Sequence, residues 1–107
     1  MFSITQGKGF TITFANGWTA SVQWGAGNYC DNYDLPISST FLRGDDVRSP
    51  DAEIAAFSGD TWLRVSGKRY APMSKRSPYG GTDVSGHIHP DRIPAFLAAV
   101  ARQRPVT

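Results

Sequence analysis

The chain has 107 residues, of which 40% are hydrophobic and 19% charged, a composition typical of a folded globular protein. Its net charge of +2 excludes both the acidic surface of a DNA mimic and the broad basic face of a general nucleic-acid binder. One domain is expected over residues 1–107, because a chain of this length leaves little room for a second core.

Cysteine use and hydropathy indicate the compartment. Cys30 is the only cysteine, which excludes an internal disulfide and favours a reducing cytoplasm. The chain begins with neither a basic segment nor an apolar run, so no signal peptide is expected. The longest apolar stretch, residues 95–101, is far too short to cross a bilayer, so no membrane partner is expected.

The first predicted element is a β-hairpin, because apolar residues alternate with polar ones over 10–14 and 18–24. A two-residue Asn-Gly loop would place apolar side chains opposite polar ones. A three-residue loop over 15–17 keeps one apolar face, and a slip of one residue would invert every side chain. The pairs are then Phe14 with Trp18, Ile12 with Ala20 and Phe10 with Val22. We therefore predict a type I turn with Gly17 in a G1 bulge.

A second hairpin is predicted over 53–57 and 62–65, with a tight turn at Gly59-Asp60. This turn pairs Ile54 with Val65 and Ala56 with Leu63 on one apolar face. The opposite face carries Phe57 beside Trp62 and is mixed in character, so partial coverage is expected.

The last element is a helix with Asp91 as N-cap and Pro105 as its stop. Its buried stripe is expected to consist of Ile93, Phe96, Leu97 and Val100. Short strands are expected at 83–88 and, at an edge, at 2–4. The fold class is therefore α+β: an antiparallel sheet of about four to six strands built from two β-hairpins, with one C-terminal helix packed on it.

Two irregular segments, 25–50 and 67–81, are where function is expected, because long loops in small domains are commonly functional or mobile. The first contains Tyr29 and Tyr33 as stacking surfaces and Asn28 and Asn32 as hydrogen-bonding groups. Its alternative interpretation is a loop whose side chains cap its own amides.

The second segment concentrates positive charge beside tyrosines, which suits a nucleotide or phosphate-bearing ligand. A solvated, mobile loop is the alternative. The predicted ligand-binding residues are Trp24, Asn28, Tyr29, Asn32, Tyr33, Arg69, Lys75 and Arg76.

Cys30 would be a nucleophile if His87 or His89 acted as its base, and the two histidines would form a metal site with Cys30 or Asp31. A buried thiol and structural histidines are the commoner roles of such residues. No catalytic residue, metal ligand or cofactor is therefore predicted.

Several motifs resemble a recurrent small protein family of tailed bacteriophages. They are the hairpin sequence Ala15-Asn16-Gly17-Trp18, the following Gly27-Asn28-Tyr29-Cys30 loop, Val84-Ser85-Gly86, and a helix over 90–100. The resemblance spans most of the chain and implies a phage origin but no reaction. This chain has extra length between Tyr33 and Pro50 and between Val65 and Thr82, where a function of its own would reside.

The function expected from these features is that of a non-enzymatic phage binding protein in the host cytoplasm. As a counter-defence factor it would sequester a nucleotide signal or block a host defence protein. A virion or assembly accessory and a Cys/His-dependent small enzyme are the alternatives. The mixed face at Phe57 and Trp62 predicts a homo-oligomer, most simply a dimer.

Overall fold

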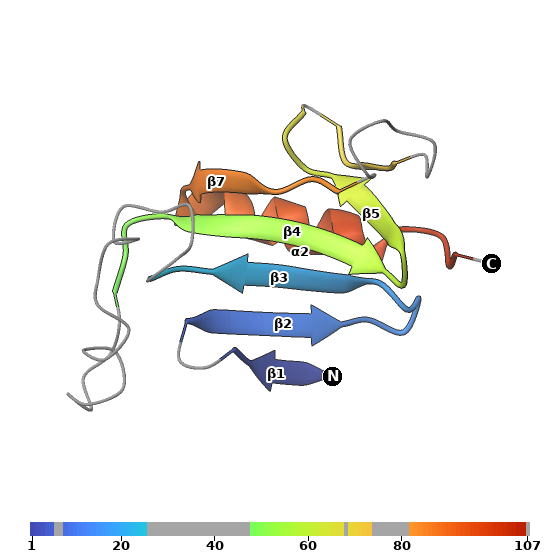
Figure 1. The fold of residues 1–107 in the computed structure, drawn as a ribbon, viewed down its shortest axis with the longest axis horizontal. Helices are drawn as coiled ribbons and strands as arrows, with labels where there is room; N and C mark the ends of the chain where they lie inside the picture. Colours follow the sequence, from blue (N-terminus) through green and yellow to red (C-terminus); the bar gives the residue numbers. More distant parts are fainter. Residues whose placement is uncertain (6–7, 26–47, 68, 74–81, 107) are drawn as a thin grey trace.

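The computed structural model describes residues 1–5, 8–25, 48–67, 69–73 and 82–106 (Figure 1). Over these residues the elements are β1 (Phe2–Ile4), β2 (Gly9–Thr13), β3 (Thr19–Gln23), β4 (Ala52–Ser58), β5 (Thr61–Arg64), β6 (Ala71–Pro72), β7 (Ser85–Ile88), a 3-10 turn η1 (Pro90–Arg92) and α2 (Ile93–Ala101). The predicted α+β class, the antiparallel sheet and the C-terminal helix are confirmed. Seven strands in the described part exceed the expected four to six, since the two-residue β6 was not predicted.

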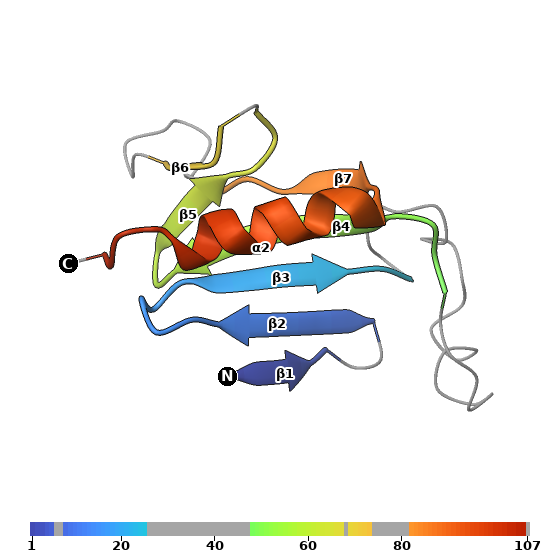
Figure 2. The same ribbon diagram turned by 180° about the vertical axis from the view of Figure 1, so that it is seen from behind.

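The sheet runs in the order β1-β2-β3-β4-β5-β6, and β7 also pairs with β4. The first four strands therefore lie in sequence order as a meander, whereas β5 and β7 share the second edge of β4. Strand β1 ends the sheet on one side, as predicted for residues 2–4. Helix α2 lies across one face of the sheet, over β3 and β4 rather than over β1 and β2 (Figure 2).

The first hairpin has the predicted register. Phe10 pairs with Val22 and Ile12 with Ala20. The Phe14 amide donates to the Trp18 carbonyl at 2.9 Å, and the Gly17 amide donates to the Phe14 carbonyl at 3.0 Å. Gly17 has φ of 85°, a left-handed conformation that glycine adopts without steric cost. The three-residue loop is thus confirmed, because only this register places the apolar side chains of both strands on the helix side.

The second hairpin is confirmed only near its turn. Phe57 pairs with Trp62 and Ser58 with Thr61. The predicted pairing of Ile54 with Val65 is wrong. Ile54 pairs instead with Ser85 of β7. The physical reason is the Asp83 carboxylate, whose Oδ2 accepts hydrogen bonds from the Val65 and Ser66 amides at 2.7 and 2.9 Å. Those amides are consequently not available to β4, and β7 occupies the edge that β5 leaves.

The start of the helix also differs from the prediction. Asp91 is not the N-cap; it lies inside the 3-10 turn η1, and Arg92 occupies the cap position of α2. The turn forms because the Arg92 amide donates to the His89 carbonyl at 3.0 Å, directly after Pro90 fixes the backbone. The predicted buried stripe is confirmed: Phe96 and Val100 are fully buried, and Ile93 and Leu97 pack against the core.

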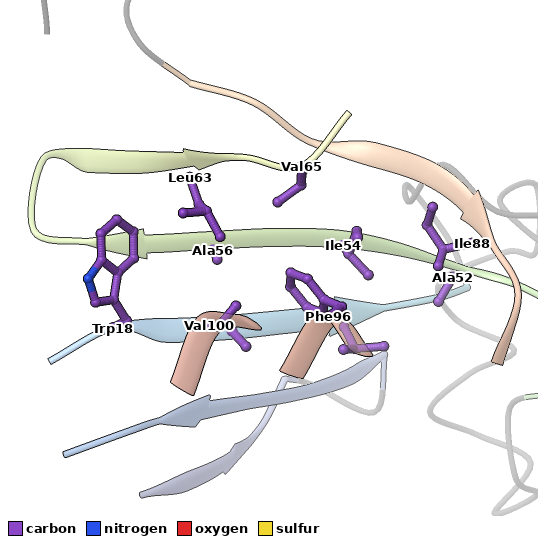
Figure 3. Packing of buried hydrophobic residues seen from close by; sticks show 11 residues of the cluster. Trp18, Ala52, Ile54, Ala56, Leu63, Val65, Ile88, Phe96 and Val100 are labelled. Carbon is purple, nitrogen blue, oxygen red and sulfur yellow. The ribbon is translucent and has the colours of Figure 1, made fainter. Parts of the chain in front are cut away.

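The core is a single layer between α2 and the sheet. Figure 3 shows Phe96 and Val100 of the helix against Ile54 and Ala56 of the central strand. Burial of a side chain such as Phe96 contributes about 2 to 3 kcal/mol to folding. The opposite face of the sheet lacks such a cover in the described part of the chain. On that face the predicted pair Phe57 and Trp62 is half-buried, with ring centroids 5.2 Å apart.

The C-terminal end of α2 is tied to the first hairpin loop. The Asn16 side-chain amide donates to the carbonyls of Val100, Ala101 and Gln103 at 3.0, 3.2 and 2.8 Å. The buried Trp18 donates from Nε1 to the Arg104 carbonyl at 2.9 Å. Carbonyls at a helix C-terminus have no partner within the helix, so these side chains satisfy them. The Asn-Gly-Trp motif therefore has a structural role.

Candidate functional site

A cavity of about 590 Å³ lies where α2 begins. The end of β3, the start of β4 and the first turn of the helix lie at this same end of the sheet (Figure 2). Three neighbouring strands supply its floor, through Phe10, Val22 and Ala52. These residues lie together because the register pairs Phe10 with Val22 and places β4 directly beside β3.

The wall of the cavity comes from the chain that enters the helix. It consists of Ile88 at the end of β7, Pro90 in η1, and Ile93 and Pro94 in the first turn of α2. Two prolines in this short stretch fix the backbone and present rings rather than amide donors to the cavity. Floor and wall are therefore apolar, which suits the body of a small organic ligand.

Asp51 is the most buried polar residue at the cavity, with 8% of its surface exposed. Its Oδ2 accepts a hydrogen bond from His87 Nδ1 at 3.2 Å. Ser49 contributes two longer contacts of 3.4 Å, one from its hydroxyl to Asp51 Oδ1 and one accepted from the Asp51 amide. A carboxylate removed from water needs such partners, and this one is consequently held in a fixed position beside apolar walls.

His87 adopts an unusual backbone conformation next to this carboxylate. Its φ is 54°, the left-handed region, which costs a residue with a Cβ about 1 to 2 kcal/mol. The pairing of β4 with β7 is irregular at the same place, between Ala52 and Ile54. The side chain is 60% exposed, so burial of His87 does not compensate the cost. Conformations of this kind cluster at functional sites.

Trp24 and Arg48 complete the lining. The Trp24 amide donates to the Lys8 carbonyl at 2.7 Å, which extends the β2–β3 pairing just far enough to place the indole at the cavity. Trp24 is partly buried and packs against the core, whereas Arg48 is exposed. An indole offers a stacking surface and a guanidinium binds anionic groups, whereas the Asp51 carboxylate accepts hydrogen bonds and repels anions. The lining therefore suits a planar ligand whose anionic group lies at Arg48 and not at Asp51.

The cavity contains one of the predicted ligand-binding residues, Trp24. Arg69 is exposed and is not part of the cavity lining. The other six predictions, Asn28, Tyr29, Asn32, Tyr33, Lys75 and Arg76, fall outside the described residues, as does the candidate nucleophile Cys30.

The two histidines are close in sequence, and both are exposed while Ile88 between them is buried. His87 contacts Asp51, and His89 is exposed just before η1. Within the described ranges, no group of three or more His, Cys, Asp or Glu side chains is arranged to hold a metal ion.

Sequence reasoning missed Arg48, Ser49 and Asp51. They precede a buried strand as Arg-Ser-Pro-Asp, and this segment reads as an ordinary polar turn. One signal could have identified Asp51: it directly precedes the apolar run of β4. A carboxylate at that position is expected to be buried and to need hydrogen-bond partners.

Comparison with known proteins gave no match to a family model, to a curated protein or to a solved structure. In the described part of the chain, no helix combines the length and apolar character needed to cross a membrane.

Proposed function

We propose that this protein is a non-enzymatic binding protein that holds a small nucleotide-like molecule in the cavity at the start of α2. The observation that supports the proposal is the cavity itself, with a volume of about 590 Å³ and a mainly apolar lining that also includes Arg48, Ser49 and Asp51. Sites for small organic ligands typically measure about 300 to 1,000 Å³ and combine apolar walls with a few fixed polar groups.

The lining suggests how such a ligand would be recognised. A planar base would stack on Trp24 and contact the apolar floor at Phe10. Arg48 would bind a phosphate group, for which a guanidinium offers several donors in one plane. Asp51 would accept a hydrogen bond from a ring or amino N–H, because its partners already hold the carboxylate in place.

The proposed setting is the cytoplasm of a bacterial host infected by a phage. There the protein would act as a counter-defence factor that removes a nucleotide signal, or that blocks a host defence protein. Sequestration requires a site and stoichiometric amounts, but no turnover. The resemblance of the hairpin and loop motifs to a phage family supports this setting.

One observation favours a second candidate, a small histidine-dependent enzyme. The contact between Asp51 Oδ2 and His87 Nδ1 fixes an imidazole in the manner of a general base. The same ligand would then be converted rather than stored. Incubation of a bound nucleotide with stoichiometric protein distinguishes the two functions, since storage returns the ligand unchanged.

The test is native mass spectrometry of protein purified from a producing host, followed by calorimetry with AMP, ATP and cyclic di-AMP as probes. Arg48→Glu is expected to weaken binding of the preferred probe at least tenfold, about 1.4 kcal/mol, because it replaces attraction to phosphate with repulsion. Arg64→Glu is the matched control: it makes the same charge change at an exposed residue of β5 that does not line the cavity. No bound mass together with no heat from any probe would contradict the proposal, as would equal losses in both variants.

A further inference from the structure

Strand β1 carries large apolar side chains that the fold leaves in solvent. Phe2 and Ile4 are 80% and 82% exposed. The register pairs them with Ile12 and Phe10, so they belong to the face of the sheet on which α2 lies. The helix covers β3 and β4 and stops short of β1 (Figure 2). Neighbouring apolar residues this exposed on one strand are typical of an interaction surface.

The backbone of β1 is also open on its outer side. Met1 and Thr13 exchange hydrogen bonds of 2.7 and 2.8 Å, and the Thr5 amide donates to the Gly9 carbonyl at 3.0 Å. Backbone groups alternate in direction along an antiparallel strand, so those of Phe2 and Ile4 point away from β2. The free edge thus presents both a row of donors and acceptors and the two exposed apolar side chains.

The other edges of the sheet in the described part of the chain are obstructed. Strand β6 has only two residues, and one of them is Pro72, which has no amide to donate. Strand β7 contains His87 in a left-handed conformation, which interrupts regular pairing. Strand β1 has no proline, charge or irregularity, the usual devices that protect an edge.

We infer that β1 pairs with β1 of a second copy of this chain, antiparallel and about a two-fold axis at Ser3. Phe2 then lies opposite Ile4 of the partner subunit, and Ile4 opposite Phe2 of the partner subunit. The outward backbone groups of these residues form the new hydrogen bonds. The arrangement is self-complementary, as a two-fold interface requires. The two sheets become one continuous sheet, with each apolar strand covering the other.

The available area suits a closed, moderately weak dimer. Complete burial of Met1, Phe2 and Ile4 in both copies would remove at most about 1,000 Å² from water, an area typical of weak interfaces. We therefore expect a dissociation constant in the range of about 1 to 100 µM. Because one edge is open and the others are obstructed, pairing ends at two copies and does not continue into a fibre.

The test is sedimentation velocity of the full chain over about 1 to 500 µM, a range that spans the expected dissociation constant. Ile4→Lys places a charge in the interface, and Ile4→Pro removes an outward amide that has no partner in β2. Both variants are expected to weaken dimerisation at least roughly tenfold. Val106→Lys is the control, an apolar-to-charged change at an exposed residue distant in sequence from β1.

Hydrogen exchange of the unaltered protein provides a second measurement that does not depend on any variant. The Phe2 and Ile4 amides are expected to become protected as the concentration rises, whereas those of β3 stay constant. A monomer over the whole range would overturn the inference. A dimer unaffected by both Ile4 variants would also overturn it, and would direct attention to the Phe57–Trp62 face. Neither result bears on ligand binding at the cavity, which contains no residue of β1.

Discussion

The two ends of α2 are held in different ways. At the C-terminal end the Asn16 side-chain amide and the Trp18 indole donate to main-chain carbonyls, and Trp18 is fully buried. At the N-terminal end the helix begins after a 3-10 turn, without a side-chain hydrogen bond at its cap, and its first turn lines a cavity. One end is closed by satisfied hydrogen bonds, whereas the other leaves room for a ligand.

Two tryptophans at the ends of β3 make the same contrast. Trp18 precedes the strand and is packed completely, whereas Trp24 follows it and keeps part of its ring accessible at the cavity. The same residue type thus fills the core at one end and lines a cavity at the other. Stability and binding should consequently respond to different substitutions.

The largest expected loss of stability is at the C-terminal end of α2. Trp18→Ala should lower the free energy of unfolding by about 4 kcal/mol, because it leaves a large cavity and an unpaired Arg104 carbonyl. Trp24→Ala should cost less than half as much, since its ring is only partly buried, but should weaken ligand binding strongly. Urea denaturation and calorimetry measure the two quantities. Equal losses of stability in the two variants would contradict the contrast.

A smaller effect is expected at the loop that holds the helix. Asn16→Ala should destabilise the protein by about 2 kcal/mol, because helix carbonyls lose their donor and the Trp18 amide loses its acceptor. Asn16→Asp keeps the acceptor but places a negative charge beside the negative end of the helix, so it should be at least as destabilising. Thermal unfolding compares them. If Asn16→Asp matched the unaltered protein, the capping role would be wrong.

The smallest effect concerns the backbone at the open end. His87→Gly and His87→Ala both remove the contact with Asp51, but only glycine relieves the left-handed conformation at φ 54°. The glycine variant should therefore be more stable than the alanine variant by about 1 kcal/mol. Denaturation in urea measures the difference. Identical stabilities would show that the β7 backbone relaxes and that no strain is stored at His87.

Much of the fold follows from local sequence. The alternation of apolar residues over 10–24 determined the register of the first hairpin, because a slip would have exposed the whole face. The buried stripe of the helix through Phe96 and Val100 was equally predictable. The competition between β5 and β7 for one edge of β4 was not predictable, since Asp83 decides it from 18 residues away. The prediction of Asp91 as the N-cap was wrong because a 3-10 turn begins at Pro90, before the α-helix.

The site was less accessible to sequence reasoning than the fold. Trp24 was found because it ends a clear strand pattern, and it does line the cavity. Asp51 and His87 are 36 residues apart, and their contact depends on the pairing of β4 with β7, which no local pattern encodes. Asn16 was interpreted as a turn residue, although its side chain serves the distant helix end. Contacts between distant segments are what a single sequence shows least.

The antiparallel pairing of β3 with β4 has a consequence for how such a protein diversifies. Gln23 and Glu53 are directly paired, so the connection from β3 to β4 has both of its ends at one place, beside the cavity. The entropic cost of closing such a connection grows slowly, by about 0.6 kcal/mol for each doubling of its length. Changes in the length of this connection are therefore expected to cost the framework little, so the surroundings of the cavity can diverge while the sheet and helix are inherited intact.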